Sequence, residues 1–259
     1  MTHDSIPPDV PTVLVLTPMK GARRHLETYV GLLEAMDWPK NRLALGILEG
    51  DSNDGTFDEL VALLPRLEAR ASRVSLHRRH YGFQLPAGLP RWTPALQLAR
   101  RQILARVRNQ LLFRALRDED FVLWIDVDLE SYPPDVLKQL IGTGFDIVMP
   151  NCVLKPGGPT YDRNAWGDKG RVTFDLRRGS GPVRLDAVGG TMLLVRADLH
   201  RDGLVFPPFP YGNQNDRVRD SHPVWGRGEI ETEGFGIMAV DMGIQPWGLP
   251  DLEIVHRSE

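Results

Sequence analysis

The stretch FVLWIDVDLE, residues 121–130, constrains the fold more than any other part of the chain. Its first five side chains are apolar, mostly β-branched or aromatic, which is typical of a strand buried inside a parallel sheet. Asp126 and Asp128 follow at the carboxyl end of that strand, where open α/β sheets bind their ligands. Side chains alternate along an extended chain, so both carboxylates are expected to face one ion. A turn or a helix cap is the competing explanation of an Asp-X-Asp triplet.

The surroundings of this strand predict a phosphate-binding edge. Carboxylate oxygens are hard ligands that suit Mn²⁺ or Mg²⁺ carrying a diphosphate. The longest expected helix, residues 94–117, leads directly into the strand. Its buried stripe is expected to be Leu104, Val107, Leu111 and Ala115, and its mostly solvated face to carry Arg100, Arg101, Arg106, Arg108 and Arg114. One or two arginines from its second half can reach the same edge and contact phosphate oxygens.

Short apolar runs alternate with amphipathic segments along most of the chain, which predicts an α/β domain. Besides 121–125, strands are expected at residues 12–17, 43–48, 74–77, 145–149 and 247–256. Besides 94–117, helices are expected at residues 23–36 and 133–140 and after Gly228. The 259 residues, of which 42% are hydrophobic, are enough to bury one large core. Residues 1–10 are expected to form a flexible tail.

Composition narrows the classes of partner and location. A net charge of −3 and a pI near 6.2 give no bulk attraction to nucleic acid, so no nucleic-acid partner is expected. The only cysteine, Cys152, cannot form an intramolecular disulfide, which fits a reducing compartment. No apolar run approaches the roughly 18 residues of a membrane span, and the first residues lack the pattern of a signal peptide. We therefore expect a cytoplasmic protein without a transmembrane segment, and we leave a homo-oligomer open.

The loop EGDSNDGT, residues 49–56, follows the second expected strand and has two interpretations. Glu49 and Asp51 lie just past the strand end, where they could accept hydrogen bonds from a base or a ribose. A well-capped turn is the alternative, because Asp54 or Thr56 could cap the helix that follows.

The second half of the chain adds polar side chains near three expected element ends: Asp186, Glu229, Glu231, Glu233 and His256. Gly189 and Gly190 interrupt an expected strand, which indicates a bulge or a close approach to the backbone. The three glutamates open the last expected helix, where a favourable interaction with the helix dipole explains part of the cluster.

Two long segments that contain glycine, residues 155–181 and 207–228, are expected to close over a ligand as a lid. They supply flat side chains on which sugar rings can pack, Tyr161, Trp166, Tyr211 and Trp225. Hydrophobic anchoring of long loops is the alternative use of these aromatic residues.

Taken in order, these features resemble GT-A-type glycosyltransferases. The shared series is a first βα unit, an acidic loop after the second strand, Arg108-Asn109 on a helix and Asp126-X-Asp128 on the next strand. More narrowly, longer blocks are similar to the fungal mannan-polymerase subunits, a family of Golgi α-mannosyltransferases that use GDP-mannose. These blocks are ARVRNQLL, WIDVDLESYPPDVLKQLI, DIVMPNC, LDAVGGTMLLVRADLHRDGLVFPPF and ETEGFGIMAVDMG. The resemblance implies a GT-A-like (Rossmann-like) α/β fold, with a mixed, mainly parallel sheet flanked by helices, in a single domain of residues 1–259.

The resemblance also implies which side chains bind the donor. The metal ion, Mn²⁺ or Mg²⁺, would be held by Asp126, Asp128 and His256, with Asp126 contacting either the ribose or the ion through water. The diphosphate would contact Arg108, or Arg106 as the alternative, with Asn109 in the same motif. The nucleoside would contact Glu49 and Asp51.

Three further carboxylates, Asp186, Glu231 and Glu233, are assigned by the resemblance to the sugar and the acceptor hydroxyl. The family transfers mannose with retention, so these groups would mainly orient hydroxyls. The function expected is therefore transfer of mannose from GDP-mannose to a glycan or a small hydroxyl acceptor. Two alternatives stay open. One is an inverting transferase with Glu231 or Glu233 as the base, and the other is a non-catalytic subunit that binds sugar nucleotides or glycans.

Overall fold

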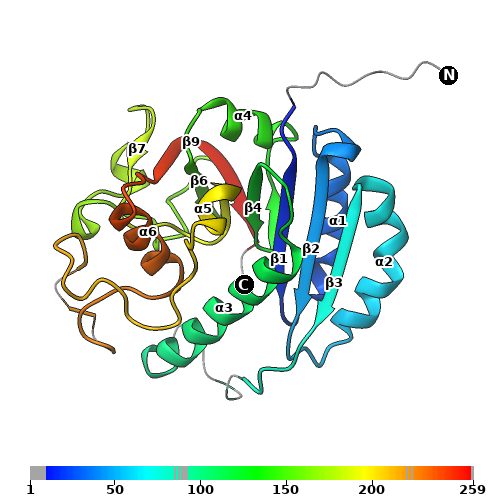
Figure 1. Ribbon diagram of the computed structural model, residues 1–259, viewed down its shortest axis with the longest axis horizontal. Coiled ribbons are helices and arrows are strands. Elements are labelled where there is room, and N and C mark those ends of the chain that lie inside the picture. Colours follow the sequence, from blue (N-terminus) through cyan, green and yellow to red (C-terminus); the bar gives the residue numbers. More distant parts are fainter. Residues whose placement is uncertain are drawn as a thin grey trace.

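The structure is a computed structural model that describes residues 10–84, 86, 88, 93–219, 221–222 and 224–257. Within these residues the strands form one nine-stranded mixed sheet with the order β3-β2-β1-β4-β8-β6-β9-β5, and β7 pairs with β9 (Figure 1). The strands are β1 Val13–Met19, β2 Leu43–Glu49, β3 Arg73–Arg78, β4 Phe121–Ile125, β5 Leu129–Ser131, β6 Ile147–Val153, β7 Val183–Arg184, β8 Met192–Arg196 and β9 Trp247–His256. The expected tail, residues 1–10, lies outside the described residues except for its last residue.

The sheet has a parallel half and a mixed half. The strands β3, β2, β1 and β4 are all parallel, so their carboxyl ends meet at one edge. β8 is antiparallel to both β4 and β6, and β6 is parallel to β9. The expected mixed, mainly parallel sheet in a single α/β domain is therefore confirmed.

Helices cover both faces of the sheet (Figure 1). They are α1 Leu26–Ala35, α2 Thr56–Arg70, α3 Pro94–Ala115, α4 Val136–Gly142, α5 Ala197–Arg201 and α6 Glu231–Asp241. Short 3₁₀ turns lie at Arg23–His25, Lys40–Arg42, Asp168–Gly170 and Phe174–Leu176. Val13 and Val15 of β1 pack in the core that contains α1 and α2, whereas Leu14 and Leu16 pack in the core that contains α3 and α6. Alternating side chains of one strand thus fill two cores, which explains the continuous apolar runs in the sequence.

The helix α3 lies unusually close to the sheet. A Cβ atom at Gly46 of β2 would lie 2.6 Å from Leu16 Cδ2 and 2.8 Å from Ala115 Cβ, so only glycine fits there. The hydrogen bonds between Asn109 and the backbone of Phe206, at 2.7 and 2.9 Å, tie the middle of α3 to the segment after α5. α3 is therefore held at the strand edge where the sequence predicts a ligand site.

Two strands continue through a proline past their expected ends. β1 runs through Pro18 to Met19, beyond the expected residues 12–17, and β6 runs through Pro150 to Val153, beyond the expected residues 145–149. The register between β6 and β9 shifts between Pro150 and Asn151, so the proline occupies an irregular position where its missing N–H is tolerated. The predicted end of β6 is therefore wrong because the bulge accommodates the proline.

No helix within the described residues is long and apolar enough to cross a membrane. Cys152, the only cysteine of the chain, is buried in β6.

A buried histidine in α5 predicts how stability depends on pH. His200 bonds to the carbonyl of Leu204 through Nδ1 at 2.7 Å, and Trp124 Nε1 donates to its Nε2 at 3.4 Å. Burial lowers the pKa of His200 from 6.5 to about 4, so between these values the unfolded chain binds a proton that the folded chain does not. The contribution of His200 to stability should therefore fall by about 3 kcal/mol as the pH drops from about 7 to about 4.

Urea unfolding of the wild type and of His200→Gln across this pH range measures the contribution of His200. The variant is expected to show a weaker pH dependence by about that amount. Asn41→Gln changes an exposed side chain that does not titrate and should keep the wild-type dependence. Equal pH slopes for the wild type and His200→Gln would contradict the assignment.

Candidate active site

Two adjoining cavities lie at the carboxyl ends of β1, β2 and β4 and share Arg108, Asp126 and Asp128. The β2-side cavity has a volume of about 390 Å³, and its wall includes Lys20, Asp51 and Tyr81. The α6-side cavity has a volume of about 420 Å³, and its wall includes Asp162, Glu231 and His256. This is the edge at which α/β sheets bind their ligands.

The Asp126–Asp128 turn is held between two strands that are distant in sequence. The N–H of Asp126 donates to the carbonyl of Thr191 at 2.9 Å, and the N–H of Arg257 donates to the carbonyl of Asp128 at 3.0 Å. Because β5 pairs with the end of β9, His256 Nε2 lies 3.1 Å from Asp128 Oδ1. The fold thus brings together a carboxylate and an imidazole that the sequence separates widely.

His256 is fixed on both sides of its ring. Nδ1 lies 2.7 Å from the carbonyl oxygen of Arg257, and the ring of Tyr161 packs against the imidazole with centroids 4.5 Å apart. Burial lowers the pKa of His256, but the hydrogen bond to Asp128 and its charge outweigh burial and raise this pKa above its ordinary value. With Nδ1–H donating to the carbonyl, Nε2 faces Asp128, to which it donates a hydrogen bond when the ring is protonated; in the neutral ring the same nitrogen can bind a metal ion.

Of the three predicted metal ligands, two contact each other and the third contacts Arg108. Within the described residues, no group of three or more His, Cys, Asp or Glu side chains is arranged to hold a metal ion. Asp128 and His256 form a pair, whereas Asp126 Oδ1 lies 3.4 Å from Arg108 Nη2. The walls of the crevice desolvate Asp126 and raise its pKa, which the guanidinium of Arg108 only partly offsets. The pair supplies one oxygen and one nitrogen ligand, which fits Mn²⁺ or Mg²⁺ because such ions keep waters or phosphate oxygens at their other positions.

Arg108 is buried, with only 4% of its surface exposed, and it connects α3 to α6. Its Nε donates to Glu231 Oε1 at 3.0 Å, and its Nη2 lies 3.4 Å from the carbonyl oxygen of Gly190. Its Nη1 is buried and has no hydrogen-bond partner among the described residues. A buried donor at the wall of a cavity without a partner is uncommon and indicates that a ligand atom completes the site.

A second buried arginine, Arg101, lies about two helical turns before Arg108. It forms ion pairs with Glu233 and, at 3.4 Å, with Glu231. The expectation of a mostly solvated arginine face on α3 is wrong for Arg101 and Arg108, because carboxylates of α6 pack against that face. Leu104, expected in the buried stripe, is only half-buried and lies at the walls of both cavities.

The backbone of Glu231 is strained. Its φ of 59° lies in the left-handed region, which non-glycine residues rarely adopt. This conformation costs of order 1–3 kcal/mol and occurs mainly at functional sites. It places the first residue of α6 where its carboxylate meets both arginines of α3.

Asp162 is a site residue that sequence reasoning missed. Its Oδ2 accepts hydrogen bonds from the N–H of Gly190 at 3.0 Å and from the hydroxyl of Thr191 at 2.8 Å. A Cβ at Gly189 would lie 2.1 Å from this oxygen, so the close approach predicted at the two glycines is confirmed. The glycine pair was the available signal, but it does not identify the carboxylate that approaches it.

The acidic residues of the 49–56 loop are occupied by backbone amides. Asp51 Oδ1 accepts from the N–H groups of Tyr81 and Gly82 at 2.9 and 3.2 Å, and its Oδ2 accepts from Phe83 N–H at 3.1 Å. Burial raises the pKa of Asp51, but these three bonds outweigh it and lower that pKa. Glu49, the last residue of β2, is fully buried and does not line the β2-side cavity; its Oε1 accepts from the N–H of Ser52 at 2.9 Å. Asp51 thus shapes the wall of the β2-side cavity, and Glu49 supports the turn.

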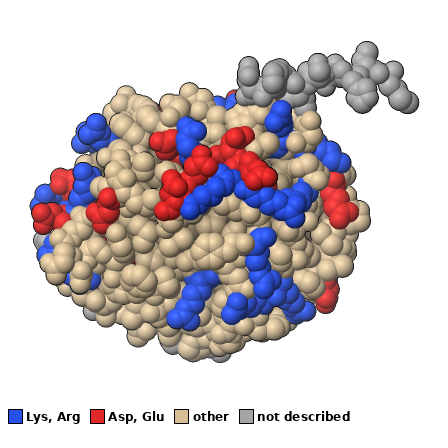
Figure 2. Space-filling model, in the orientation of Figure 1, with Lys and Arg blue, Asp and Glu red and all other residues tan. Residues whose placement is uncertain are grey.

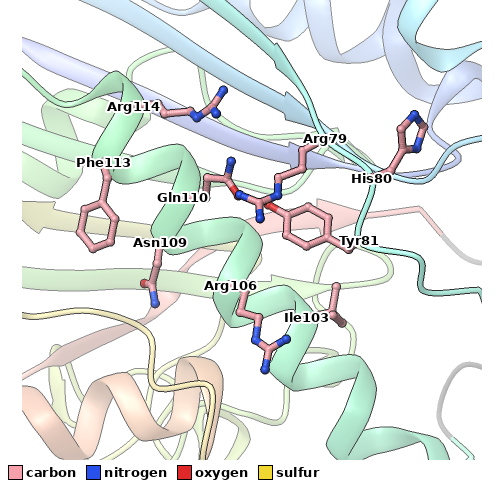
Figure 3. Close-up of a pocket in the computed structure, with 9 residues that line it drawn as sticks. All are labelled: Arg79, His80, Tyr81, Ile103, Arg106, Asn109, Gln110, Phe113 and Arg114. Atoms are coloured by element: carbon pink, nitrogen blue, oxygen red, sulfur yellow. The ribbon is translucent and has the colours of Figure 1, made fainter.

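Three other predicted residues do not join the crevice. Arg106 and Asn109 line a separate hollow on the other side of α3 (Figure 3). Asp186 lines neither cavity; its Oδ2 accepts from the N–H of Asp168 at 2.7 Å, and its Oδ1 pairs with Arg217 Nη1 at 2.9 Å. The structure therefore groups Arg108, Asp126, Asp128, Glu231 and His256, and it places Glu233 behind them.

Two aromatic residues of the expected lid hold their segments to α6 by hydrogen bonds. Trp166 is buried and donates through Nε1 to Glu233 Oε1 at 2.9 Å, and Tyr211 donates through its hydroxyl to Asp241 at 3.0 Å. Tyr161 instead lines the α6-side cavity. Closure of the two segments over a ligand stays a prediction.

Comparison with solved structures identifies the class of fold. A mannosyltransferase from Pyrobaculum calidifontis, PcManGT, solved in complex with GDP-Man and Mn²⁺, superposes with a TM-score of 0.60 at 16% identity, over 98% of this chain and 61% of that one. GalNAc-T7, solved with UDP, GalNAc and Mn²⁺, gives a TM-score of 0.56 at 12% identity, over 98% of this chain and 45% of that one. The fold is that of the GT-A glycosyltransferases.

Sequence comparison identifies the family. The chain belongs to the Anp1 family, whose model matches residues 7–173 and 175–210. Over 95% of this chain, it is 26% identical to the mannan polymerase complex subunit mnn9 and 27% identical to the mannan polymerase II complex anp1 subunit, both of Schizosaccharomyces pombe. The matches span 80% and 64% of those relatives. A probable inactive glycosyltransferase 25 family member 3 of Bos taurus is 29% identical over 78% of this chain and 35% of that protein.

The buried pairing of Arg108 predicts a strong effect on stability. Arg108→Met should destabilise the protein by about 3–5 kcal/mol, because it leaves the buried carboxylate of Glu231 with less compensation. Replacing both partners, in Arg108→Met/Glu231→Met, should recover much of this loss. Urea unfolding measures both changes.

Arg106→Met is the matched control, since Arg106 is exposed on the same helix and changes stability by no more than about 0.5 kcal/mol. Equal losses for the two single variants would show that Arg108 is not a buried partner of α6.

Proposed function

We propose that the protein transfers mannose from GDP-mannose to a hydroxyl of a glycan or a small acceptor, in a metal-dependent reaction with retention at the anomeric carbon. The observation that carries this proposal is the convergence of the Asp128–His256 pair with the unpartnered Nη1 of Arg108 at one strand edge. Breaking the sugar–phosphate bond places negative charge on a leaving diphosphate. Cationic groups fixed at that position lower the barrier.

The division of work follows from the contacts of each side chain. Arg108 is held by Glu231, so its free N–H group can meet a diphosphate oxygen without reorganisation. Asp128 and His256 would hold the metal ion, which when bound supplies further positive charge to the diphosphate. Asp126, next to Arg108, would orient the ribose or a metal-bound water.

The β2-side cavity fits the nucleoside. It adjoins the Asp126–Asp128 turn, and its wall combines Tyr81 and Phe83 with the cation of Lys20. GDP-mannose is favoured as the donor because relatives over most of the chain are mannan polymerase subunits. At 16% identity, the similarity to PcManGT supports the fold and does not identify the donor.

The state of the glutamates favours retention over inversion. An inverting transferase needs a free general base beside the acceptor hydroxyl. Burial raises the pKa of Glu231, but Arg108 and Arg101 outweigh burial and lower it, so Glu231 is a weak base. Glu233 is occupied by Arg101, Trp166 and Arg219. The α6-side cavity, which includes Tyr161 and Asn164, would then hold the acceptor.

A non-catalytic subunit is the second candidate function. It is favoured by the related protein of Bos taurus whose name describes it as probably inactive, and by relatives that are named as subunits of complexes. A subunit that binds sugar nucleotides would use the Asp128–His256 pair and Arg108 as an enzyme does, so turnover is what separates the two candidates. Catalysis is the first proposal because the mannan polymerase subunits match 95% of the chain and the Bos taurus protein 78%. A cytoplasmic location stays a prediction.

Turnover of GDP-mannose in the presence of Mn²⁺ tests the proposal directly. The wild type should release GDP, and a chelator should abolish the release. Asp128→Asn and His256→Gln should each lower kcat by about 100-fold or more, because the charge at the diphosphate is lost. Asp198→Asn, an exposed change outside both cavities, is the matched control. NMR of the product should show an α linkage.

Three outcomes separate the alternatives. A β-linked product would identify an inverting enzyme. Thermal stabilisation by GDP and Mn²⁺ without turnover would identify a binding subunit. Turnover that is indifferent to Asp128→Asn and to the chelator would contradict the metal-dependent mechanism.

The lid proposal has its own measurement. Segments 155–181 and 207–228 should gain protection from hydrogen exchange when GDP and Mn²⁺ are added, because closure excludes water from the reacting sugar. The helix α2, on the other face of the sheet, serves as the internal control. Protection of the Asp126–Asp128 turn without any change in the two segments would show that they are static.

A further inference from the structure

A third hollow, of about 700 Å³, lies between the end of β3 and the outer side of α3 (Figure 3). We call it the β3–α3 groove and define it by Arg79, Tyr81, Arg106, Gln110, Phe113 and Arg114. Arg108, Asp126 and Asp128 do not line the groove, so it is distinct from the candidate active site. Tyr81 and Ile103 line both the groove and the β2-side cavity and form the wall between them.

The groove is strongly cationic. It contains three guanidinium groups and no carboxylate. In the part of the chain that the structure describes, neither Arg106 nor Arg114 forms an ion pair, and Arg79 contacts only the neutral side chains of Gln110 and Tyr81. Figure 2 shows Lys and Arg side chains with few acidic neighbours over α3 and the end of β3, whereas the upper half of the same face mixes both signs. The net charge of −3 therefore conceals a local cationic surface.

The centre of the groove is organised before any ligand arrives. Arg79 donates to Gln110 Oε1, and the hydroxyl of Tyr81 donates to the same oxygen at 2.8 Å. The guanidinium of Arg79 lies 5.2 Å from the centre of the Tyr81 ring. These contacts hold a cation in place without neutralising it, and a fixed guanidinium loses little entropy when it binds an anion.

The spacing of the cations indicates the size of the ligand. Arg106 and Arg114 are eight residues apart on α3, which corresponds to about 12 Å along the helix axis. Figure 3 shows Arg79 between them, reaching across from β3. A single phosphate can contact only one part of such an array, whereas linked phosphoryl groups can contact more than one guanidinium. Beside them, the ring of Phe113 is 70% exposed and offers a flat apolar surface for the body of such a ligand.

We propose that the β3–α3 groove binds a ligand that carries at least two phosphoryl groups. Guanidinium forks bind phosphate oxygens in pairs, and the density of negative charge on linked phosphates matches three cations in one hollow better than scattered carboxylates do. The source of the phosphoryl groups is either a free compound or a lipid headgroup. The site does not depend on the proposed transferase function.

Isothermal titration with tripolyphosphate, in the presence of a chelator, tests the site. Arg114→Glu should raise the dissociation constant of the groove by about tenfold or more, since a charge-assisted contact becomes a repulsion. Arg114 is exposed and lines neither cavity of the candidate active site, so folding and the crevice should be unaffected. Lys40→Glu makes the same change of charge at an exposed site in the turn before β2 and is the matched control. Added salt should weaken the binding.

Two further titrants identify the chemistry. Vesicles that contain a phospholipid with a phosphomonoester on its headgroup, in addition to the phosphodiester that links the headgroup, test the lipid source. If the wild type binds these vesicles and not tripolyphosphate, and Arg114→Glu abolishes that binding, the phosphoryl site stands and the ligand is a lipid. Poly-glutamate tests carboxylates, and tighter binding of poly-glutamate than of tripolyphosphate would overturn the proposal. Binding of neither phosphate probe, or equal weakening by Arg114→Glu and Lys40→Glu, would also overturn it.

Discussion

The buried ion pair between Arg108 of α3 and Glu231 of α6 is the interaction on which the site depends. α3 packs on the parallel half of the sheet, while α6 begins after a long irregular segment and packs beside it. Both charges are almost completely removed from water, so separating the helices would leave them uncompensated. Burial of this kind adds little net stability, but it permits only one relative placement of the two helices.

The same pair explains why the crevice can bind an anion although acidic residues surround it. Glu231 takes the Nε side of the guanidinium, and the opposite edge, with the unpartnered Nη1, is left for a ligand. Asp162 holds the Gly190–Thr191 backbone, whose carbonyl groups contact Arg108 and the N–H of Asp126. The carboxylates of the site therefore mostly position other groups and are already occupied. Little free base remains, which is consistent with a reaction that depends on stabilising a leaving diphosphate.

The sequence predicted the sheet better than it predicted the site. The bounds of β4, Phe121–Ile125, agree with its apolar run, because a strand buried on both faces leaves a local signal. The bounds of β9, Trp247–His256, also agree with the expectation, although its side chains are only partly buried. Glu231, which pairs with both Arg101 and Arg108, lies more than 120 residues away from them, and no local pattern distinguishes a buried arginine from a solvated one. Asp51 lines the β2-side cavity, but its position past a strand end did not reveal that its oxygens accept hydrogen bonds from the backbone of residues 81–83.

The helix α3 carries buried, paired arginines on one face and exposed arginines on the other. Successive residues of a helix are rotated by about 100°, so Arg106 and Arg108 point in nearly opposite directions although they are two residues apart. Arg108 enters the core, where α6 supplies a carboxylate, and Arg106 faces the groove, where within the described residues no carboxylate meets it. Folding therefore requires carboxylates to neutralise the arginines of the inner face only. Because Arg106 and Arg114 on the outer face form no ion pair within the described residues, their grouping beside Arg79 and Phe113 is better explained by binding than by stability.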